Sequence, residues 1–308
     1  MELSLCDLHC DTVYEAHKRH QSLLENDLAI SLANSKKYNR YLQVAALWID
    51  YSLSDEEGWN VYLEMLDYLK NDPTIQNGNI RLIRNRHQLS SKVPGFILSV
   101  EDARILSGKL ERLETLYQHG VRILTPCWKG VSCIGGSHDT TVGLTKFGRK
   151  VIETALELGI LIDISHASYQ TSMEIFDIAE PLHRPVIATH SNAYDVCPNP
   201  RNLKRDQIDR IRSSGGVIGL NLYPPFVKEA STAQLLDLLP HIEYFLSQGM
   251  KNQLCLGCDM DGAQMPQEIQ NVSHLSSLAE LLLTKGYSEA FIDNLFYQNA
   301  YSFLSKKL

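Results

Sequence analysis

The sequence lacks the features that mark membrane-spanning, secreted and nucleic-acid-binding proteins. No stretch approaches the roughly 18 consecutive apolar residues of a transmembrane helix. The initial segment MELSLCDLHCDT has neither the basic nor the apolar region of a signal peptide. Acidic residues outnumber basic ones by 36 to 29, and no dense block of lysine and arginine occurs. We therefore expect a cytoplasmic protein without a membrane anchor, which acts on a small molecule and not on nucleic acid.

Cysteine is sparse and follows no disulfide or metal-binding pattern. The seven cysteines are an odd number spread over 308 residues, which favours a reducing compartment over a disulfide framework. Cys255 and Cys258 form a CxxC, but residues three apart on a strand face opposite sides. Cys6 and Cys10 are expected to share a strand face, yet lie about 13 Å apart. We expect all four to be small buried side chains.

Internal repeats and low-complexity tracts are also absent, and short apolar segments alternate with helical patterns instead. Apolar residues recur at i, i+3 and i+4 spacing between most of these segments, as from Trp59 to Leu69. Gly120, Gly159 and Gly249 stand where helices are expected to end. Two closing helices are expected at residues 276–285 and 288–304. Eight strands are expected at residues 3–8, 41–49, 95–100, 121–125, 160–164, 185–189, 217–222 and 253–258.

The strand segments are apolar on both faces, which indicates a parallel sheet covered by helices on both sides. Eight strand–helix units favour an α/β fold, a (β/α)8 TIM barrel with extended loops after its strands and helices at its C-terminus. We expect one such domain over residues 1–308. A doubly wound open sheet is the alternative, but no GxGxxG follows the first strand, so its dinucleotide-binding version lacks a fingerprint.

Histidines and acids follow five of the eight expected strands. They are His9 and Asp11 after the first strand, Glu101 after the third, His166 after the fifth, His190 after the sixth and Asp259 after the eighth. The active site of a (β/α)8 barrel is built at this end of the strands. Imidazole and carboxylate ligands without thiolate suit Zn²⁺, with Mn²⁺, Fe²⁺ or Co²⁺ as alternatives.

The number of ligands favours two metal ions, because five ligands exceed what one tetrahedral site needs. A carboxylate such as Glu101 can bridge two ions about 3.5–4 Å apart. Two ions would lower the pKa of a bridging water and polarise a substrate carbonyl, which leaves Asp259 to accept and pass on the proton. Asp261 either competes for that role or caps a loop. The pattern predicts metal-assisted hydrolysis.

Longer motifs carry information about the family: LHCDT, VEDA, GLTKFGRKVIETALELGILIDISHAS, ATHSNAYDVCPNPRNL, CDMDG and SEAFIDNLFYQNAYSFL. Together they resemble the membrane (renal) dipeptidase family, peptidase family M19, among the amidohydrolase-type metal-dependent barrels. The resemblance covers nearly the whole chain and is most specific in residues 143–203. It implies a metallo-dipeptidase that hydrolyses dipeptides with a hydroxide bridging two zinc ions.

The resemblance also implies a ligand role for each matching residue. His9 and Asp11 would bind one zinc ion, His166 and His190 would bind the other, and Glu101 would bridge the two. The implied partner of this centre is a dipeptide. The oligomeric state is left open, with a homodimer among the possibilities.

Four further residues match positions near the substrate. Asp259 matches the acid that handles the proton, and Arg201 matches an arginine that holds the substrate's terminal carboxylate, which suits a planar guanidinium. Tyr223 matches a tyrosine near the substrate. Trp128 stands where animal members of the family have a substrate-contacting histidine, and some bacterial members also have tryptophan there. Tryptophan donates one N–H and does not titrate near neutral pH.

Two other functions are compatible with the pattern. The metal centre would equally serve the hydrolysis of another small amide, a lactone or a cyclic imide. A catalytically idle barrel used as a binding protein is disfavoured, because none of the ligand positions or the proton-handling acid is lost.

Overall fold

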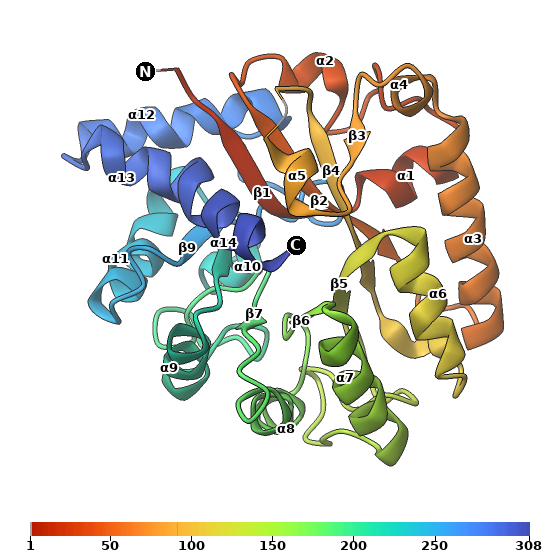
Figure 1. Ribbon diagram of the computed structural model, residues 1–308. Coiled ribbons are helices and arrows are strands. Elements are labelled where there is room, and N and C mark those ends of the chain that lie inside the picture. Colours follow the sequence, from red (N-terminus) through yellow and green to blue (C-terminus); the bar gives the residue numbers. More distant parts are fainter. Residues whose placement is uncertain (1, 91) are drawn as a thin grey trace.

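The structure, a computed structural model, describes residues 2–90 and 92–308, and its centre is a parallel β-sheet rolled into a ring (Figure 1). Neighbouring strands follow the order β7-β6-β5-β4-β2-β1-β9-β8. These strands are β1 (Leu5–Cys10), β2 (Tyr41–Trp48), β4 (Gly95–Glu101), β5 (Val121–Thr125), β6 (Leu161–Asp163), β7 (Val186–Ile187), β8 (Ile218–Leu220) and β9 (Leu254–Leu256). Each coincides with one of the eight predicted segments. The short strand β3 (Arg81–Leu82), which was not predicted, pairs with β4 outside the ring.

The ring closes between β7 and β8. Ala188 pairs with Ile218 in a parallel bridge, and the amide of Gly219 donates to the carbonyl of Ala188 at 2.8 Å. A ring of eight parallel strands with helices outside it is a (β/α)8 barrel. The predicted fold is therefore confirmed, and the open doubly wound sheet is excluded.

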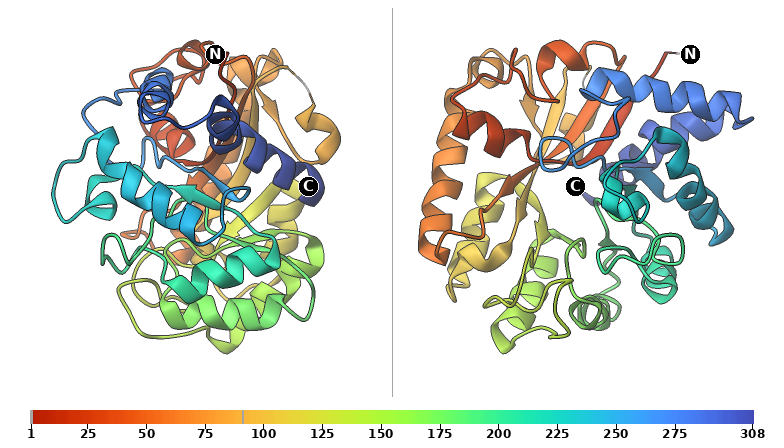
Figure 2. Two further views of the ribbon diagram at one scale, coloured as in Figure 1. Left: turned by 90° about the vertical axis from the view of Figure 1, so that its left-hand side faces the viewer. Right: turned by 180° about the vertical axis from the view of Figure 1, so that it is seen from behind.

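Most helices surround the ring on its outside (Figures 1 and 2), and α14 lies across one end of it. They are α1 (Thr12–Lys18), α2 (Leu32–Ser35), α3 (Asp55–Asn71), α4 (Pro73–Gln76), α5 (Arg86–Leu89), α6 (Glu111–His119), α7 (Lys146–Leu158), α8 (Tyr169–Ala179), α9 (Arg205–Ser214), α10 (Pro224–Val227), α11 (Leu239–Ser247), α12 (Ser276–Thr284), α13 (Glu289–Asp293) and α14 (Asn299–Lys307). Helix α3 begins with a capping box between Ser54 and Glu57. Helices α6 and α7 end at Gly120 and Gly159, which adopt the left-handed conformation expected of such glycines.

None of the described helices is long and apolar enough to span a membrane.

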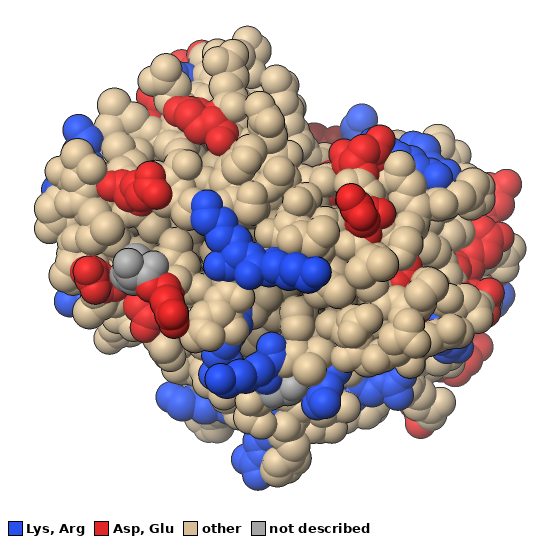
Figure 3. All heavy atoms as spheres, turned by 90° about the horizontal axis from the view of Figure 1, so that it is seen from above, with Lys and Arg blue, Asp and Glu red and all other residues tan. Residues whose placement is uncertain are grey.

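The surface carries charges of both signs. On the face seen from above in Figure 3, basic side chains gather near the centre while acidic side chains lie mainly toward the sides. Charges of the two signs are therefore unevenly distributed over this face.

The inside of the ring is filled by apolar side chains, as in a packed barrel core. A second, larger apolar cluster lies between the strands and the surrounding helices. The inner cluster draws on all eight ring strands or their first flanking residues: Cys6, Leu8, Leu42, Val44, Ile97, Ile123, Leu161, Ile187, Val217 and Cys255. Because these side chains fill the inside of the ring, the space for a ligand lies beyond them, at the carboxyl ends of the strands.

The C-terminal segment closes the opposite, amino-terminal end of the ring. Tyr297, Phe303 and Leu304 belong to the inner cluster, and they come from α14 and from the π-helical turn η4 (Asn294–Gln298) that joins it to α13. The two closing helices predicted at residues 276–285 and 288–304 are confirmed, the second as the run α13–η4–α14.

A β-bulge in β1 changes which side chains face the ring axis. The pairing of β1 with β2 shifts by one residue between Asp7 and Cys10. Cys6 consequently belongs to the inner cluster, whereas Cys10 belongs to the outer one. The expectation that these cysteines share a face is wrong for this reason. The same shift leaves His9 and Asp11 facing the ring axis.

Two glycines let β7 approach β8 and β9 closely. A Cβ on Gly219 would lie 1.9 Å from the carbonyl oxygen of Thr189, and a Cβ on Gly257 would lie 1.8 Å from it. Thr189 directly precedes His190, so this close approach decides how deep into the ring that histidine stands.

We predict that Gly257→Ala destabilises the fold by about 1–3 kcal/mol or more, because the added methyl group meets backbone and not a flexible side chain. Urea unfolding followed by circular dichroism measures the loss. The control is Gly286→Asn: this glycine has positive φ with open space around it, and asparagine tolerates that conformation. An unchanged midpoint for Gly257→Ala would contradict the prediction.

Candidate metal centre

The six side chains predicted from the strand ends converge at the carboxyl end of the barrel. Their side chains are at most 13% exposed, and only those of His166 and Asp259 exceed 10%. His9 lies on β1 with Asp11 just after it, Glu101 ends β4, and His166, His190 and Asp259 each lie three residues beyond β6, β7 and β9. The topology thus brings together residues separated by up to 250 positions of sequence.

Glu101 stands between two groups of ligand atoms and turns one carboxylate oxygen to each. Its Oε1 lies 3.0 Å from Nε2 of His166 and 3.4 Å from Nε2 of His190. These two nitrogens are themselves 3.0 Å apart. Its Oε2 lies 3.5 Å from Nε2 of His9. The two oxygens of Glu101 therefore face different sets of possible ligand atoms.

His9 links the second group of ligand atoms to the first. Its Nε2 lies 3.4 Å from Oδ2 of Asp11 and 3.8 Å from Oδ1 of Asp259. The ring of His9 stacks on the ring of His190 with centroids 3.7 Å apart. Two triads could each hold a metal ion, because within each the ligand atoms lie within 4.8 Å of one another: His9 with Glu101 and His190, and His9 with Asp11 and Asp259.

Several polar atoms of this cluster are buried without a hydrogen-bond partner, which is costly in a folded protein. They include Nε2 of His9, Oδ1 of Asp11 and Oε1 of Glu101. Ligand atoms on a tetrahedral zinc ion with bonds of about 2.0–2.1 Å lie about 3.3 Å apart, close to the separations found here. The residues present therefore fit a divalent metal.

The electrostatics of the cluster would be satisfied by a bound cation. Burial raises the pKa of Glu101 to about 7, against the opposing influence of His9, and burial also raises the pKa of Asp259. Burial lowers the pKa of His9, but the carboxylates around it prevail and raise that pKa well above its usual value. Burial lowers the pKa of His166 and His190 well below the usual value. A bound cation would favour ionised carboxylates beside neutral imidazoles.

The backbone is strained where the strands end. Of the seven described non-glycine residues with positive φ, four lie in or beside the cluster. His166 has a φ of 71° and Asp259 of 66°, while Asp102 and Asp261 have 82° and 65°. Such conformations persist only where the surroundings impose them, and they concentrate at functional sites.

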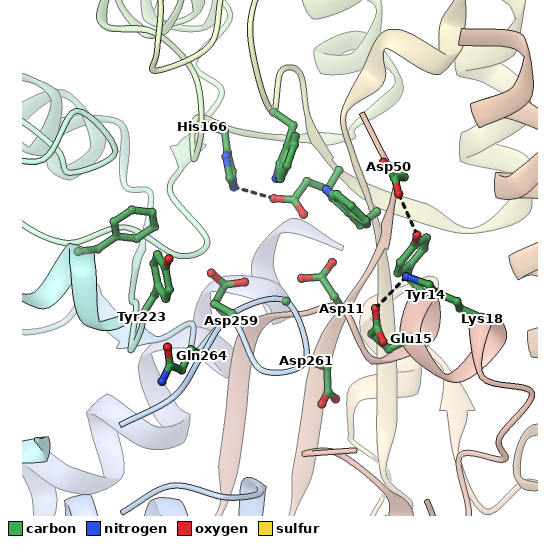
Figure 4. A pocket seen from close by; sticks show the side chains of 16 residues that line it. Asp11, Tyr14, Glu15, Lys18, Asp50, His166, Tyr223, Asp259, Asp261 and Gln264 are labelled. Atoms are coloured by element: carbon green, nitrogen blue, oxygen red, sulfur yellow. Dashed lines mark hydrogen bonds and ion pairs between the residues drawn. The ribbon is translucent and has the colours of Figure 1, made fainter. Parts of the chain in front are cut away.

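A cavity of about 530 Å³ opens over the cluster (Figure 4). Tyr223 and Gln264 lie on one side of the view and Asp50 and Tyr14 on the other. Between them lie the side chains of Asp11, His166 and Asp259. The lining residues are Asp11, Tyr14, Glu15, Lys18, Trp48, Asp50, Glu101, Trp128, His166, Tyr223, Phe226, Asp259, Asp261, Gly262, Ala263 and Gln264.

Two of the three predicted substrate-contacting residues line this cavity, and the third contacts the lining residue Phe226. Trp128 meets Trp48 edge-on at 5.1 Å between centroids, and Tyr223 meets Phe226 in the same way at 4.8 Å. Arg201 is buried and is not among the lining residues. Its guanidinium lies 5.2 Å from the centroid of the Phe226 ring, and its Nε has no hydrogen-bond partner.

Asn221 belongs to the site and was missed at the level of sequence. It directly follows β8, and its Nδ2 donates to Oδ2 of Asp259 at 3.1 Å. The rule that polar residues at strand ends build the site would have found it. Asp261 anchors a loop, because its carboxylate accepts from the hydroxyl of Thr12 at 2.6 Å and from the amide of Ala29 at 2.7 Å.

The family model for "Membrane dipeptidase (Peptidase family M19)" matches residues 1–306. The chain belongs to peptidase family M19. The predicted family is thereby confirmed, and with it an enzyme of the metallo-dipeptidase type that needs a metal cofactor.

Individual relatives of this M19 peptidase differ in how much of their length aligns. An uncharacterized protein in the pqqA 5′ region of Klebsiella pneumoniae is 33% identical over 220 residues, 68% of this chain and 80% of that protein. Dipeptidase aclJ of Aspergillus oryzae is 30% identical over 149 residues, 47% of this chain but only 35% of that protein.

One solved structure shares the whole fold. It is a metallo peptidase from Rhodobacter sphaeroides liganded with a phosphinate mimic of the dipeptide L-Ala-D-Ala. The two chains superpose with a TM-score of 0.92 at 23% identity, with all of both chains covered. This M19 peptidase therefore has the complete barrel of that enzyme.

Gly262 leaves room for the carboxylates of the cluster. A Cβ at this position would lie 1.9 Å from Oδ2 of Asp11 and 2.8 Å from Oδ1 of Asp259. We predict that Gly262→Ala displaces Asp11 and weakens metal binding at least about tenfold, the scale on which metal sites respond to misplaced ligands. Metal content after dialysis against a graded chelator measures the effect. Gln264→Ala, two positions along the same segment, is the control, and equal metal retention in both variants would contradict the prediction.

Proposed function

We propose that the protein is a dipeptidase with two zinc ions. The observation that carries the proposal is the placement of Glu101, whose two carboxylate oxygens face separate groups of ligand atoms. Membership of family M19 supports a dipeptide as substrate, as does the dipeptide mimic in the Rhodobacter sphaeroides enzyme.

In this proposal Glu101 would contribute a carboxylate oxygen to each of two sites. His9 and Asp11 would hold one ion, and His166 and His190 would hold the other. When bound, the ions would supply Lewis acidity, which lowers the pKa of a water and polarises the scissile carbonyl.

Asp259 is the residue proposed to carry the proton. It lines the cavity, and Asn221 holds its Oδ2, so that Oδ1 is turned toward His9 and the cluster. Because burial raises its pKa, this carboxyl holds a proton more readily than an exposed aspartate. It accepts the proton from the attacking water and passes it to the leaving amine.

Arg201 is proposed to hold the C-terminal carboxylate of the dipeptide. Its Nη1 and Nη2 make only long hydrogen bonds of 3.3 Å, to Ser191 and to the carbonyl of His190, and its Nε is free. The C-terminal residue then lies on the side of Tyr223 and Phe226. The N-terminal residue of the substrate lies on the side of Asp50 and Tyr14 (Figure 4).

Removal of metal is expected to abolish dipeptide hydrolysis, and zinc is expected to restore it. Metal analysis of the wild type should give two ions per chain. His166→Ala should retain about one, because one ligand group stays intact. Full activity after chelation, or two ions held tightly by His166→Ala, would refute the binuclear proposal.

Loss of the substrate carboxylate is expected to lower kcat/KM about 10- to 100-fold, since a hydrogen bond to a charged group contributes about 1.5–3 kcal/mol. The comparison uses a dipeptide and its C-terminal amide with wild type and Arg201→Lys. The variant should lose activity on the free dipeptide but show little further loss on the amide. Equal losses on both substrates would assign Arg201 a structural role only.

A further inference from the structure

Asp163 is a buried carboxylate at the end of β6 that the proposed mechanism does not use. It has no solvent exposure and accepts four hydrogen bonds. The amides of Ser165 and Thr189 donate to Oδ1 at 3.0 and 2.8 Å. The hydroxyls of Thr125 and Thr189 donate to Oδ2 at 2.7 and 2.6 Å. Asp163 therefore joins β5, β6 and the end of β7 directly beneath the metal centre.

The hydroxyl of Thr189 also contacts the ring of His190. Its Oγ1 lies 2.8 Å from Nδ1 of His190, while its third neighbour, the hydroxyl of Ser165, lies at 3.5 Å. Thr189 has a single hydrogen to donate. A carboxylate has none, so the contact of 2.6 Å with Asp163 uses that hydrogen. The contact with His190 must then use a hydrogen on Nδ1.

We infer that the buried chain Asp163–Thr189 fixes the tautomer of His190 and thereby prepares its Nε2 as a metal ligand. With the hydrogen on Nδ1, the lone pair of Nε2 points at the cluster, where Oε1 of Glu101 lies at 3.4 Å and Nε2 of His166 at 3.0 Å. Thr189 and Asp163 are positioning residues that act through His190. The inference rests on the proposed function only in taking His190 as a ligand.

The burial of this chain adds to its effect. His190 is fully buried, so no water replaces a lost partner on Nδ1. A histidine that binds a metal through one ring nitrogen commonly donates the hydrogen on its other ring nitrogen to a fixed acceptor. Loss of that acceptor costs about 10- to 100-fold in metal affinity. Here the acceptor is the hydroxyl of Thr189, which Asp163 holds in place.

Thr189→Val tests the inference, since valine keeps the shape and removes the hydroxyl. Thr125→Val is the matched control. It removes the other hydroxyl that donates to Oδ2 of Asp163, and that hydroxyl does not contact His190. Zinc affinity is measured on the full chain by competition with a chromophoric chelator, without dipeptide. The absorption spectrum of the Co²⁺-loaded protein reports the ligand geometry.

The expected result is about 10- to 100-fold weaker binding of one ion and an altered Co²⁺ spectrum in Thr189→Val. The other ion should bind as in wild type. Thr125→Val should keep both affinities, and Thr189→Ser should recover them. If Thr189→Val does not fold, Thr189→Ala takes its place.

Unchanged affinity and spectrum in Thr189→Val, or equal losses in Thr125→Val, would overturn the inference and leave the proposed function standing. A wild-type protein that binds fewer than two ions would instead overturn the binuclear proposal. The two failures are distinguished because the wild-type stoichiometry is measured first.

Discussion

The burial of three carboxylates beside three histidines is the constraint on which the rest of the structure depends. Asp11, Glu101 and Asp259 have little contact with water, and isolated buried charges are expensive. Polar atoms of the cluster without partners show that the protein alone does not satisfy this charge. A bound cation would remove that deficit and would couple the folding of this region to metal binding.

Support for the cluster comes from two further buried aspartates, one on each side of the ring. Asp7 accepts from the amides of His9 and Cys258 and from the side chain of Gln43, which joins β1 to β9 and β2. Asp163 joins β6 to β5 and β7 in the same way. Buried carboxylates are tolerated where donors surround them. Asp7 holds the amide of His9, and Asp163 holds the amide of Thr189, which precedes His190.

The two sides of the cavity carry different charged groups. At one side the ring of Phe226, which packs against Tyr223, contacts the buried guanidinium of Arg201. Asp50 and Tyr14 lie at the other side of the cavity. Asp50 is ionised at neutral pH, because hydrogen bonds from Ser52 lower its pKa. A substrate with a negative group at one end and a positive group near the other matches these charges, as a dipeptide does.

Sequence by itself determined the strands, the fold class and the six residues of the cluster. Strands buried on both faces are apolar throughout, and a parallel barrel brings their carboxyl ends to one place. Only the tertiary structure decided the bulge in β1, the outward turn of Cys10 and the burial of Arg201. It also decided the contacts of Asn221 and Asp163. The local sequence pattern indicates which side chains are buried. A bulge or a hydrogen bond between distant strands depends on partners that only the closed ring brings together.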